Sequence, residues 1–292
     1  MRVLLLGASG FIGQSIVSKV PAHVKLTGTY FKNEIKNEHG HFEHLDYLSE
    51  GLDWKQIIEP YSCIIIAARA NARNGIERDR ISQRSQSAFA KMILAVKESE
   101  AKPFIVAVNG SLSYGHRGEE LVKTDDKINP TGFAKSYSIA EMPFRDYLGQ
   151  SQEMAILRAP WVLGLGSWFS QMYLLANKIP IIGDGKQWMS VVTVDGLAED
   201  IWRLVEMRTP GVHHPKLISR CRQKDFAHTV QGVTKKQTQK LGKISLWRME
   251  SQMRESILAS IKLDDGDSDR SESDAANGEL RAAIEKIYSG FS

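Results

Sequence analysis

A glycine-containing turn close to the start of the chain restricts the fold more than any other feature of the sequence. An apolar run, residues 3–6, stops at Gly7, and Gly10 and Gly13 follow at intervals of three residues before a second apolar stretch. This pattern predicts a buried strand, a tight turn and a helix. Gly7 permits the tight turn, Gly10 lets a ligand approach the backbone, and Gly13 lets the helix lie close to the strand.

A turn of this kind directs free backbone N–H groups at the start of a helix toward an anion, and a pyrophosphate is a group that such turns hold. We therefore predict a dinucleotide cofactor at residues 7–13, with Ser9, Phe11 and Ile12 completing the binding turn. The alternative is a strand–turn–helix unit that binds no ligand. The alternation of strands and helices further along the chain favours the cofactor.

The composition is that of an ordinary globular protein, with 42% hydrophobic and 25% charged residues among 292. No apolar run approaches the ~20 residues that span a bilayer, and the first one is too short for a signal peptide. The two cysteines, Cys63 and Cys221, lack metal-ligand spacing, and the adjacent His213 and His214 would face opposite sides of a strand. We expect no metal, no membrane partner and a cytoplasmic location.

The net charge of +4 is unevenly distributed. Residues 216–248 contain nine lysines and arginines and one acid, whereas residues 264–274 contain six acids and one base. The basic stretch either binds an anionic ligand or is a solvated helix face, and the second alternative is favoured. Because no aromatic residues are interleaved in a basic motif, nucleic-acid binding is not expected. The acidic stretch is typical of an exposed loop or a disordered insert.

Apolar runs alternate with helical patterns along most of the chain. We predict strands at residues 2–7, 24–30, 62–68, 103–109 and 154–159, and helices at residues 11–20, 85–98, 134–148 and 196–207. Such alternation indicates right-handed crossovers and a parallel sheet covered on both faces. The predicted fold is a Rossmann-type, doubly wound α/β sheet over residues 1–160 plus about 190–210. A smaller substrate lobe is expected from about 161–189 and 211–292.

Ligands of doubly wound sheets bind beyond the carboxyl ends of the strands, near the point where the strand order reverses. The segments that directly follow each predicted strand, residues 30–32, 67–71, 109–114 and 159–164, are therefore cofactor candidates. Besides the glycine turn, the individual candidates are Tyr30, Lys32, Ala67, Ala68, Arg69, Asn109 and Pro160.

The end of the second predicted strand bears on the choice of nucleotide. An NAD site usually has an acid there, which accepts hydrogen bonds from the ribose hydroxyls. Here the segment LTGTYFKN contains no acid, and Phe31 and Lys32 take that place. A cation suits a 2′-phosphate, so we predict NADP in preference to NAD. Glu34 is close enough to keep NAD open, and Lys32 is alternatively an ordinary surface residue.

Several segments, in order, resemble the extended short-chain dehydrogenase/reductase family, which includes NAD-dependent epimerases, dehydratases and dTDP-4-dehydrorhamnose reductases. The segments are GASGFIG, IIIAARA, NGSLSYG, INPTGFAKSYSIAE, LRAPWVLGLGSWF and GDGKQWMSVVTVDGLAED, and the resemblance extends to about residue 207. It implies that Asp46 contacts the adenine and that Asp195 is the acid at the entry to the substrate lobe. It also implies a small-molecule substrate and a homodimer through residues 85–98 and 134–148.

The catalytic positions depart from the family pattern. The resemblance implies a tyrosine that exchanges a proton with the substrate oxygen, a lysine four residues later, and a serine or threonine after the fifth strand. Alignment on Pro130 and Glu141 puts Phe133 at the tyrosine position. Tyr137 then stands at the lysine position and Gly110 at the serine position.

A shift of one helical turn makes Tyr137 the tyrosine, but Glu141 then replaces the lysine, and a carboxylate disfavours a phenolate. Tyr137 and Ser111, the neighbour of Gly110, are the candidate proton donors, and Tyr137 is also expected at the cofactor. For each of them, local hydrogen bonding or packing is the alternative. Weaker candidates with the same alternative are Ser113, Tyr114 and His116.

Two functions compete. The first is an NADP-dependent oxidoreductase or epimerase-like enzyme with a non-standard acid–base set, acting on a carbonyl or alcohol, with sugar nucleotides among the candidate substrates. The second is a catalytically silent, NADP-binding regulatory or scaffold subunit, which the combined loss of the three catalytic positions would explain. A Rossmann-type protein without any nucleotide is a third, least favoured alternative. An enzyme is favoured because both the cofactor segments and the lobe segments are intact.

Overall fold

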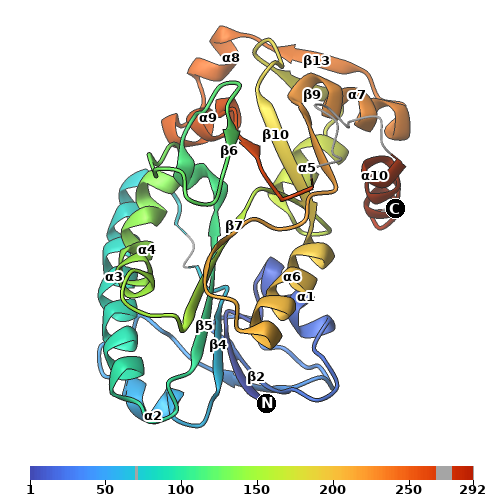
Figure 1. Ribbon diagram of the computed structural model, residues 1–292. Coiled ribbons are helices and arrows are strands. Elements are labelled where there is room, and N and C mark those ends of the chain that lie inside the picture. Colours follow the sequence, from blue (N-terminus) through green and yellow to red (C-terminus); the bar gives the residue numbers. More distant parts are fainter. Residues whose placement is uncertain (70–71, 268–277, 292) are drawn as a thin grey trace. The chain divides into compact units, whose positions relative to one another are not determined.

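The computed structural model describes residues 1–69, 72–267 and 278–291, which form two compact units (Figure 1). Unit 1 comprises Met1–Asn109, Ser136–Arg158 and Ala198–His213. Unit 2 comprises Gly110–Lys135, Ala159–Leu197 and His214–Ser292. Of the segments singled out in the sequence, Ala70, Asn71 and residues 268–274 of the acidic stretch lie outside the described residues.

Unit 1 is built on a seven-stranded sheet with the order β11-β7-β5-β4-β1-β2-β3. Its strands are β1 (Arg2–Leu6), β2 (Lys25–Tyr30), β3 (His41–His44), β4 (Cys63–Ile66), β5 (Phe104–Gly110), β7 (Met154–Ala159) and β11 (Gly211–His213). The pairs β1–β2, β1–β4, β2–β3, β4–β5 and β7–β11 are parallel. The strand order reverses between β1 and β4, which is the switch point where a doubly wound sheet binds ligands.

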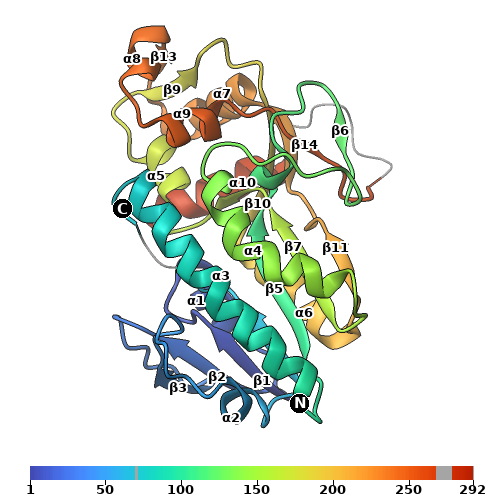
Figure 2. The same cartoon turned by 90° about the vertical axis from the view of Figure 1, so that its left-hand side faces the viewer.

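Helices cover both faces of this sheet. They are α1 (Phe11–Ser18), α2 (Trp54–Ile58), α3 (Gly75–Glu98), α4 (Ala134–Leu148) and α6 (Val194–Met207). In Figure 1 α3 and α4 lie on one face and α1 and α6 on the other, and Figure 2 shows α3 and α4 in front of the strands. The Nε1–H of Trp202 on α6 donates to the carbonyl oxygen of Ile16 on α1, 2.9 Å away. The predicted Rossmann-type α/β fold is thereby confirmed.

The longest helix of unit 1 differs from its prediction. We predicted a helix over residues 85–98, whereas α3 begins at Gly75. The side chain of Asn74 caps this helix by accepting a backbone N–H of the first turn, 2.9 Å away. The early turns bury small polar residues, Ser82 and Ser85, instead of apolar ones. Hydrophobic periodicity therefore gives no signal for this half of the helix.

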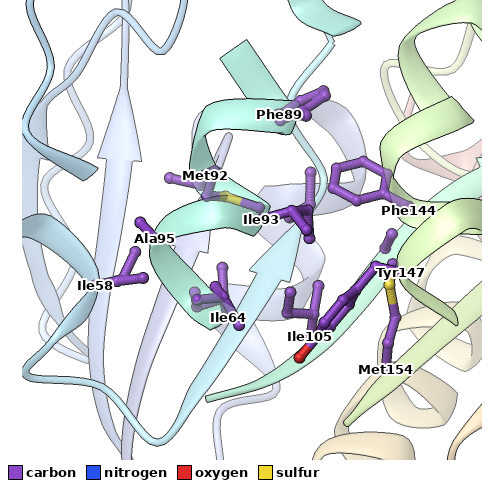
Figure 3. Close-up of a cluster of buried hydrophobic side chains, with 14 of the residues drawn as sticks. Ile58, Ile64, Phe89, Met92, Ile93, Ala95, Ile105, Phe144, Tyr147 and Met154 are labelled. Atoms are coloured by element: carbon purple, nitrogen blue, oxygen red, sulfur yellow. The ribbon is translucent and has the colours of Figure 1, made fainter. Parts of the chain in front are cut away.

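The main core of unit 1 lies between the sheet and the helices α3 and α4 (Figure 3). The ring centroids of Phe89 on α3 and Phe144 on α4 are 4.8 Å apart, and Tyr47 stacks on Phe89 at 5.1 Å. Ile64 of β4 and Ile105 of β5 belong to the same cluster and are fully buried. This packing holds α4 in place next to β4 and β5.

Unit 2 contains, in the part of the chain that the structure describes, three small sheets. The first joins β8 (Trp161–Leu163), β10 (Trp188–Thr193) and β12 (Ser219–Arg222), the second β9 (Ile179–Ile182) and β13 (Thr238–Leu241), and the third β6 (Leu121–Val122) and β14 (Lys262–Leu263). Its helices are α5 (Trp168–Leu174), α7 (Gln223–Thr234), α8 (Lys243–Trp247), α9 (Ser251–Leu258) and α10 (Gly278–Ser289). The rings of Phe169, Tyr173 and Phe226 form the centre of its core, with centroids 4.9–5.4 Å apart.

The basic stretch 216–248 runs through β12, α7, β13 and α8, so it is not a single solvated helix face. Arg220 is buried, and its Nη1 donates to the carbonyl oxygen of Leu263 at 3.2 Å. Arg222 is paired with Glu119, whose pKa falls to about 2 because the guanidinium hydrogen-bonds the carboxylate. Two of the basic residues, Arg220 and Arg222, therefore bind other groups of unit 2. None of the helices among the described residues combines the length and apolarity needed to cross a membrane.

Candidate cofactor and active site

The glycine turn of unit 1 is tightly packed between β1 and α1. Gly7 has a φ of +90°, and a Cβ on it would lie 2.6 Å from the Cα of Ala68. A Cβ on Gly13 would lie 2.1 Å from the carbonyl oxygen of Gly7. No side chain fits at either position without moving backbone atoms. The packing of the turn on the segment after β4, and of α1 on the turn, therefore requires both glycines.

Gly10 differs from Gly7 and Gly13, because the packing of the protein does not require a glycine at this position. Its φ and ψ, −75° and 166°, are open to any residue. Apart from its chain neighbours, the only described atom within 4 Å of an added Cβ is the oxygen of Gly7, at 3.3 Å. A side chain there would otherwise project into open space. A ligand that approaches this backbone gives a reason for the missing side chain.

The first turn of α1 presents backbone donors next to Gly10. The first hydrogen bond inside the helix runs from the N–H of Gln14 to the carbonyl oxygen of Gly10, at 2.9 Å. The amides of Phe11, Ile12 and Gly13 precede it, so helix geometry leaves them without an intrahelical acceptor. Ser9 is fixed in the turn by Gln14, whose Nε2 donates to its carbonyl oxygen at 3.0 Å. This arrangement suits a pyrophosphate.

The end of β2 supports the turn and carries the residues that bear on nucleotide choice. The hydroxyl oxygen of Thr29 accepts the N–H of Gly7 at 3.2 Å. The next residue, Tyr30, meets His44 of β3 edge to face, with centroids 5.9 Å apart. Lys32 is exposed and lies 5.9 Å over the ring of Phe31, and among the described residues it has no ion-pair partner.

Asp46 has a structural use that the sequence did not reveal. Its Oδ1 accepts the N–H of Leu48 at 3.0 Å, and its carbonyl oxygen accepts the N–H of Ser49 at the same distance. The half-buried carboxylate thus stabilises the turn that follows β3. This turn fixes the position of Asp46 within unit 1.

The segment after β4 contains Arg69, which contacts Tyr137 of α4; both residues were cofactor candidates in the sequence. The N–H of Ala67 donates to Leu6 at 3.0 Å, and Ala68 lies against Gly7. The next residue, Arg69, is exposed, and its guanidinium carbon lies 4.3 Å from the centroid of the Tyr137 ring on α4. Both residues are predicted from the sequence to lie at the cofactor, but their contact with each other is not, since no local pattern links two residues so far apart in the chain.

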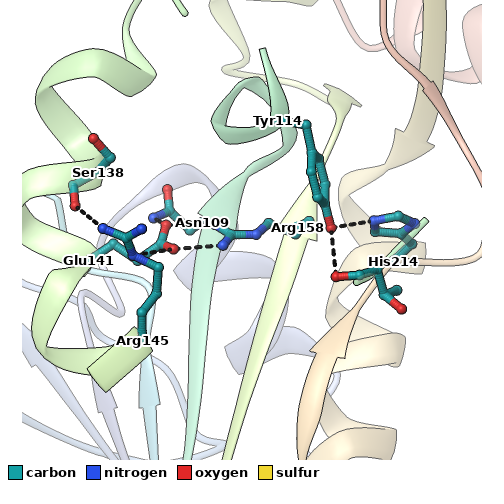
Figure 4. A network of polar contacts seen from close by, with 8 residues as sticks. Asn109, Tyr114, Ser138, Glu141, Arg145, Arg158 and His214 are labelled. Carbon is teal, nitrogen blue, oxygen red and sulfur yellow. Dashed lines mark hydrogen bonds and ion pairs between the residues drawn. The ribbon is translucent and has the colours of Figure 1, made fainter. Parts of the chain in front are cut away.

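Glu141, one helical turn after Tyr137, is the centre of a buried ion pair (Figure 4). Its two carboxylate oxygens accept the Nη1 and Nη2 groups of Arg158 at 2.5 and 2.6 Å. Both side chains are almost fully buried, with 2% and 1% of their surfaces exposed. Asn109 donates to the same carboxylate through Nδ2, and Arg145 lies 3.5 Å from it. Through these contacts, the Glu141 carboxylate links α4 to β5 and β7.

Unit 2 contains the other candidates near the serine position. Gly110 has an ordinary φ of −88°, and an added Cβ would come no closer than 4.0 Å to any neighbouring atom, so a serine would fit there. Ser111 is buried and opens a 3-10 turn at Ser111–Tyr114. The hydroxyl of Tyr114 lies 2.8 Å from Nε2 of His214 (Figure 4). His116 accepts the N–H of Ser260 at 3.1 Å.

Phe133 also belongs to unit 2, whereas Tyr137 belongs to unit 1. The N–H of Phe133 donates to the hydroxyl of Ser256 at 3.0 Å, and its ring lies edge-on to Trp168 at 6.4 Å. Lys135 binds the carboxylate of Glu255 at 2.6 Å, and this hydrogen bond lowers the pKa of Glu255. Phe133 is thus a packing residue of unit 2. Pro160, half-buried, separates β7 from β8.

Solved structures share this fold at low sequence identity. A UDP-N-acetylglucosamine 4-epimerase from Methanobrevibacter ruminantium M1 is 17% identical, with a TM-score of 0.77 over 99% of this chain and 97% of that chain. The human epimerase family protein SDR39U1, solved with NADPH, is 18% identical, with a TM-score of 0.75 over 99% of each chain. A dTDP-4-dehydrorhamnose reductase from Clostridium acetobutylicum ATCC 824 is 14% identical, with a TM-score of 0.75 over 100% and 99%.

At the level of sequence, no curated protein matches the chain significantly. The family model of the NAD dependent epimerase/dehydratase family does match it, over residues 3–217. This range contains the glycine turn, the Arg69–Tyr137 contact and the buried Glu141–Arg158 pair. Since the match covers well over half of the chain, the protein belongs to the NAD dependent epimerase/dehydratase family, as the resemblance of its segments predicted.

Proposed function

We propose that this protein binds NADP(H) at the glycine turn of unit 1. The observation that carries the proposal is Gly10, where the protein leaves room for a side chain and has none. The amides of the first turn of α1 would hold the pyrophosphate, and Asp46 would face the adenine. Membership of an NAD-dependent family supports the same assignment.

Lys32 favours NADP over NAD in this proposal. Its ammonium group is exposed beyond the end of β2 and has no acid partner among residues 1–69, 72–267 and 278–291. A 2′-phosphate would supply the missing counter-charge. Structural relatives have been solved with either cofactor: the human protein with NADPH, and a UDP-glucuronic acid 4-epimerase from Bacillus cereus with NAD.

For the reaction we propose the oxidation or reduction of a carbonyl or alcohol carbon, with a sugar nucleotide as the first substrate class to test. The nicotinamide, when bound, supplies or accepts the hydride. Tyr137 would exchange the proton at the substrate oxygen. The carboxylate of Glu141 would not oppose it, because Arg158 neutralises that charge. Two of the structural relatives, a UDP-N-acetylglucosamine 4-epimerase and a dTDP-4-dehydrorhamnose reductase, are named for sugar nucleotides, which supports this substrate class.

A catalytically silent, NADP-binding subunit is the second candidate. Gly110 favours it, because the structure has room for a serine at the position where the family uses one. Phe133 favours it too, since its ring is used for packing against Trp168. Such a protein would hold the cofactor without consuming it.

Nucleotide binding is tested by titrating the protein with NADPH and following the cofactor fluorescence. We expect Gly10→Val to weaken binding by about 100-fold or more, since a branched side chain would occupy the approach to the turn. Gly51→Val is the matched control, because an added Cβ at Gly51 meets no atom within 4 Å. Equal affinity of the two variants would refute the proposed site. Binding of NADH as tightly as NADPH would refute the NADP assignment.

The reaction is tested by following NADPH consumption with dTDP-4-dehydrorhamnose and with phenanthrenequinone as carbonyl probes. Tyr137→Phe is expected to lower kcat by about 100-fold or more, because it removes the proton donor. Tyr147→Phe, on the same helix but in the buried core, serves as the control. Turnover that survives Tyr137→Phe shows that Tyr137 is not the donor. Tight NADPH binding without turnover of either probe selects the silent subunit.

A further inference from the structure

The contact between Arg69 and Tyr137 lies next to the glycine turn. Arg69 directly follows Ala68, whose Cα is the atom nearest to a Cβ built on Gly7. Tyr137 contacts Arg69 from α4, and the centroid of its ring lies 4.3 Å from the guanidinium carbon of Arg69. Both residues belong to unit 1, so one compact unit sets the geometry of this pair.

The charge of Arg69 is not neutralised by another residue of the described chain. Its guanidinium has no acid partner among the described ion pairs, and its side chain is exposed. Arg145 on α4 and Arg158 on β7 differ from it, because both lie against the carboxylate of Glu141.

We propose that Arg69 is the positioning residue for Tyr137, and that it provides the positive charge which the residue one turn after Tyr137, Glu141, cannot provide. This inference rests on the proposed function. The planar guanidinium holds the tyrosine ring in one orientation by a cation–π contact. The same charge lies where it can stabilise negative charge on the ring oxygen.

The proton transfer shows why a charge is needed at this point. When a carbonyl is reduced, the O–H bond of Tyr137 breaks and a new O–H bond forms at the substrate oxygen. The electron pair of the broken bond stays on the Tyr137 oxygen, which becomes a phenolate. In the opposite direction the phenolate takes the proton from the alcohol. Arg69 would stabilise the phenolate in both directions, without giving up a proton itself.

The expected size of the effect follows from the separation of the charges and from solvent exposure. A unit charge centred 4.3 Å from the ring centroid, in surroundings between bulk water and a protein surface, changes a rate by about 10- to 50-fold. The exposure of Arg69 keeps the effect well below that of a buried pair.

The kinetic test compares three arginine variants, with phenanthrenequinone as the probe and melting curves to establish folding. Arg69→Met should lower kcat by about 10- to 50-fold and change the KM for NADPH by less than about twofold. Arg69→Lys, which keeps the charge, should retain at least about a third of kcat. Arg80→Met, another exposed arginine of unit 1, is the control. A higher KM with unchanged kcat would assign Arg69 to the cofactor phosphates and overturn the inference.

A double-mutant cycle separates this inference from the proposed function. If Arg69 acts through Tyr137, the variant with both Arg69→Met and Tyr137→Phe should be no slower than Tyr137→Phe alone. If Tyr137→Phe is slow but Arg69→Met is not, the role of Arg69 fails and that of Tyr137 stands. If the unaltered protein turns over neither carbonyl probe, both fail.

The contact itself can be measured without turnover, by NMR of protein with isotope-labelled arginine. The side-chain protons of Arg69 should be shifted upfield by the ring current of Tyr137, and Tyr137→Leu should abolish the shift. Arg80 signals should stay in place in both proteins. An Arg69 signal that is unshifted in the unaltered protein would overturn the inference, whatever the kinetics.

Discussion

Replacing Glu141 by glutamine should destabilise the protein strongly, although the two side chains have the same shape. The carboxylate is bound by two donors of Arg158 at 2.5 and 2.6 Å, and both partners are about 1–2% exposed. The substitution leaves the Arg158 charge buried without a counter-charge. Breaking a buried pair in this way costs about 3–5 kcal/mol. Asn109 and Arg145 lose their charged partner as well, so the loss in free energy of unfolding should lie near the upper end of this range.

Urea unfolding followed by tryptophan fluorescence measures this loss. Glu199→Gln is the matched control, because the Lys19–Glu199 pair is 2.7 Å long but both side chains are exposed. That change should cost at most about 1 kcal/mol. Combining Glu141→Leu with Arg158→Met should recover most of the stability, since an apolar pair needs no counter-charge. A loss of stability in Glu141→Gln no larger than that in Glu199→Gln would show that the buried pair does not need its counter-charge.

Three further outcomes are expected. Gly13→Ala should lower the free energy of unfolding by at least about 2 kcal/mol in urea titrations, because its Cβ would lie 2.1 Å from the oxygen of Gly7; a loss below about 0.5 kcal/mol would contradict the packing argument. Burial raises the pKa of the Cys63 thiol to about 12, so it stays protonated in mildly alkaline buffer. A disulfide-exchange reagent should therefore modify it only after unfolding, and rapid modification of the native protein would show otherwise. If α3 and α4 form a homodimer interface, Leu94→Glu should yield a monomer in sedimentation, because Leu94 is 57% exposed on α3; a monomeric parent protein would rule the interface out.

Several features of the site were predictable because they depend on local sequence. The turn at Gly7 and Gly13 needs residues without a side chain, and the apolar run before it needs burial, so a few adjacent residues carry the signal. The strands of the sheet were readable for the same reason, since β1, β4 and β7 are buried along most or all of their length. The exposed edge strand β3 has no such signal, and it was missed.

By itself, the sequence determined the Rossmann-type fold and the family, because these follow from periodicity, glycine spacing and the order of motifs. The same features predict where a cofactor would bind. Only the tertiary structure decided what Glu141 and Tyr137 contact. The packing of α4 against the sheet of unit 1 directs Glu141 to Arg158 and Tyr137 to Arg69. A contact between distant residues depends on which strand ends and helix faces the fold brings together. No local pattern in a single sequence shows which of them will meet.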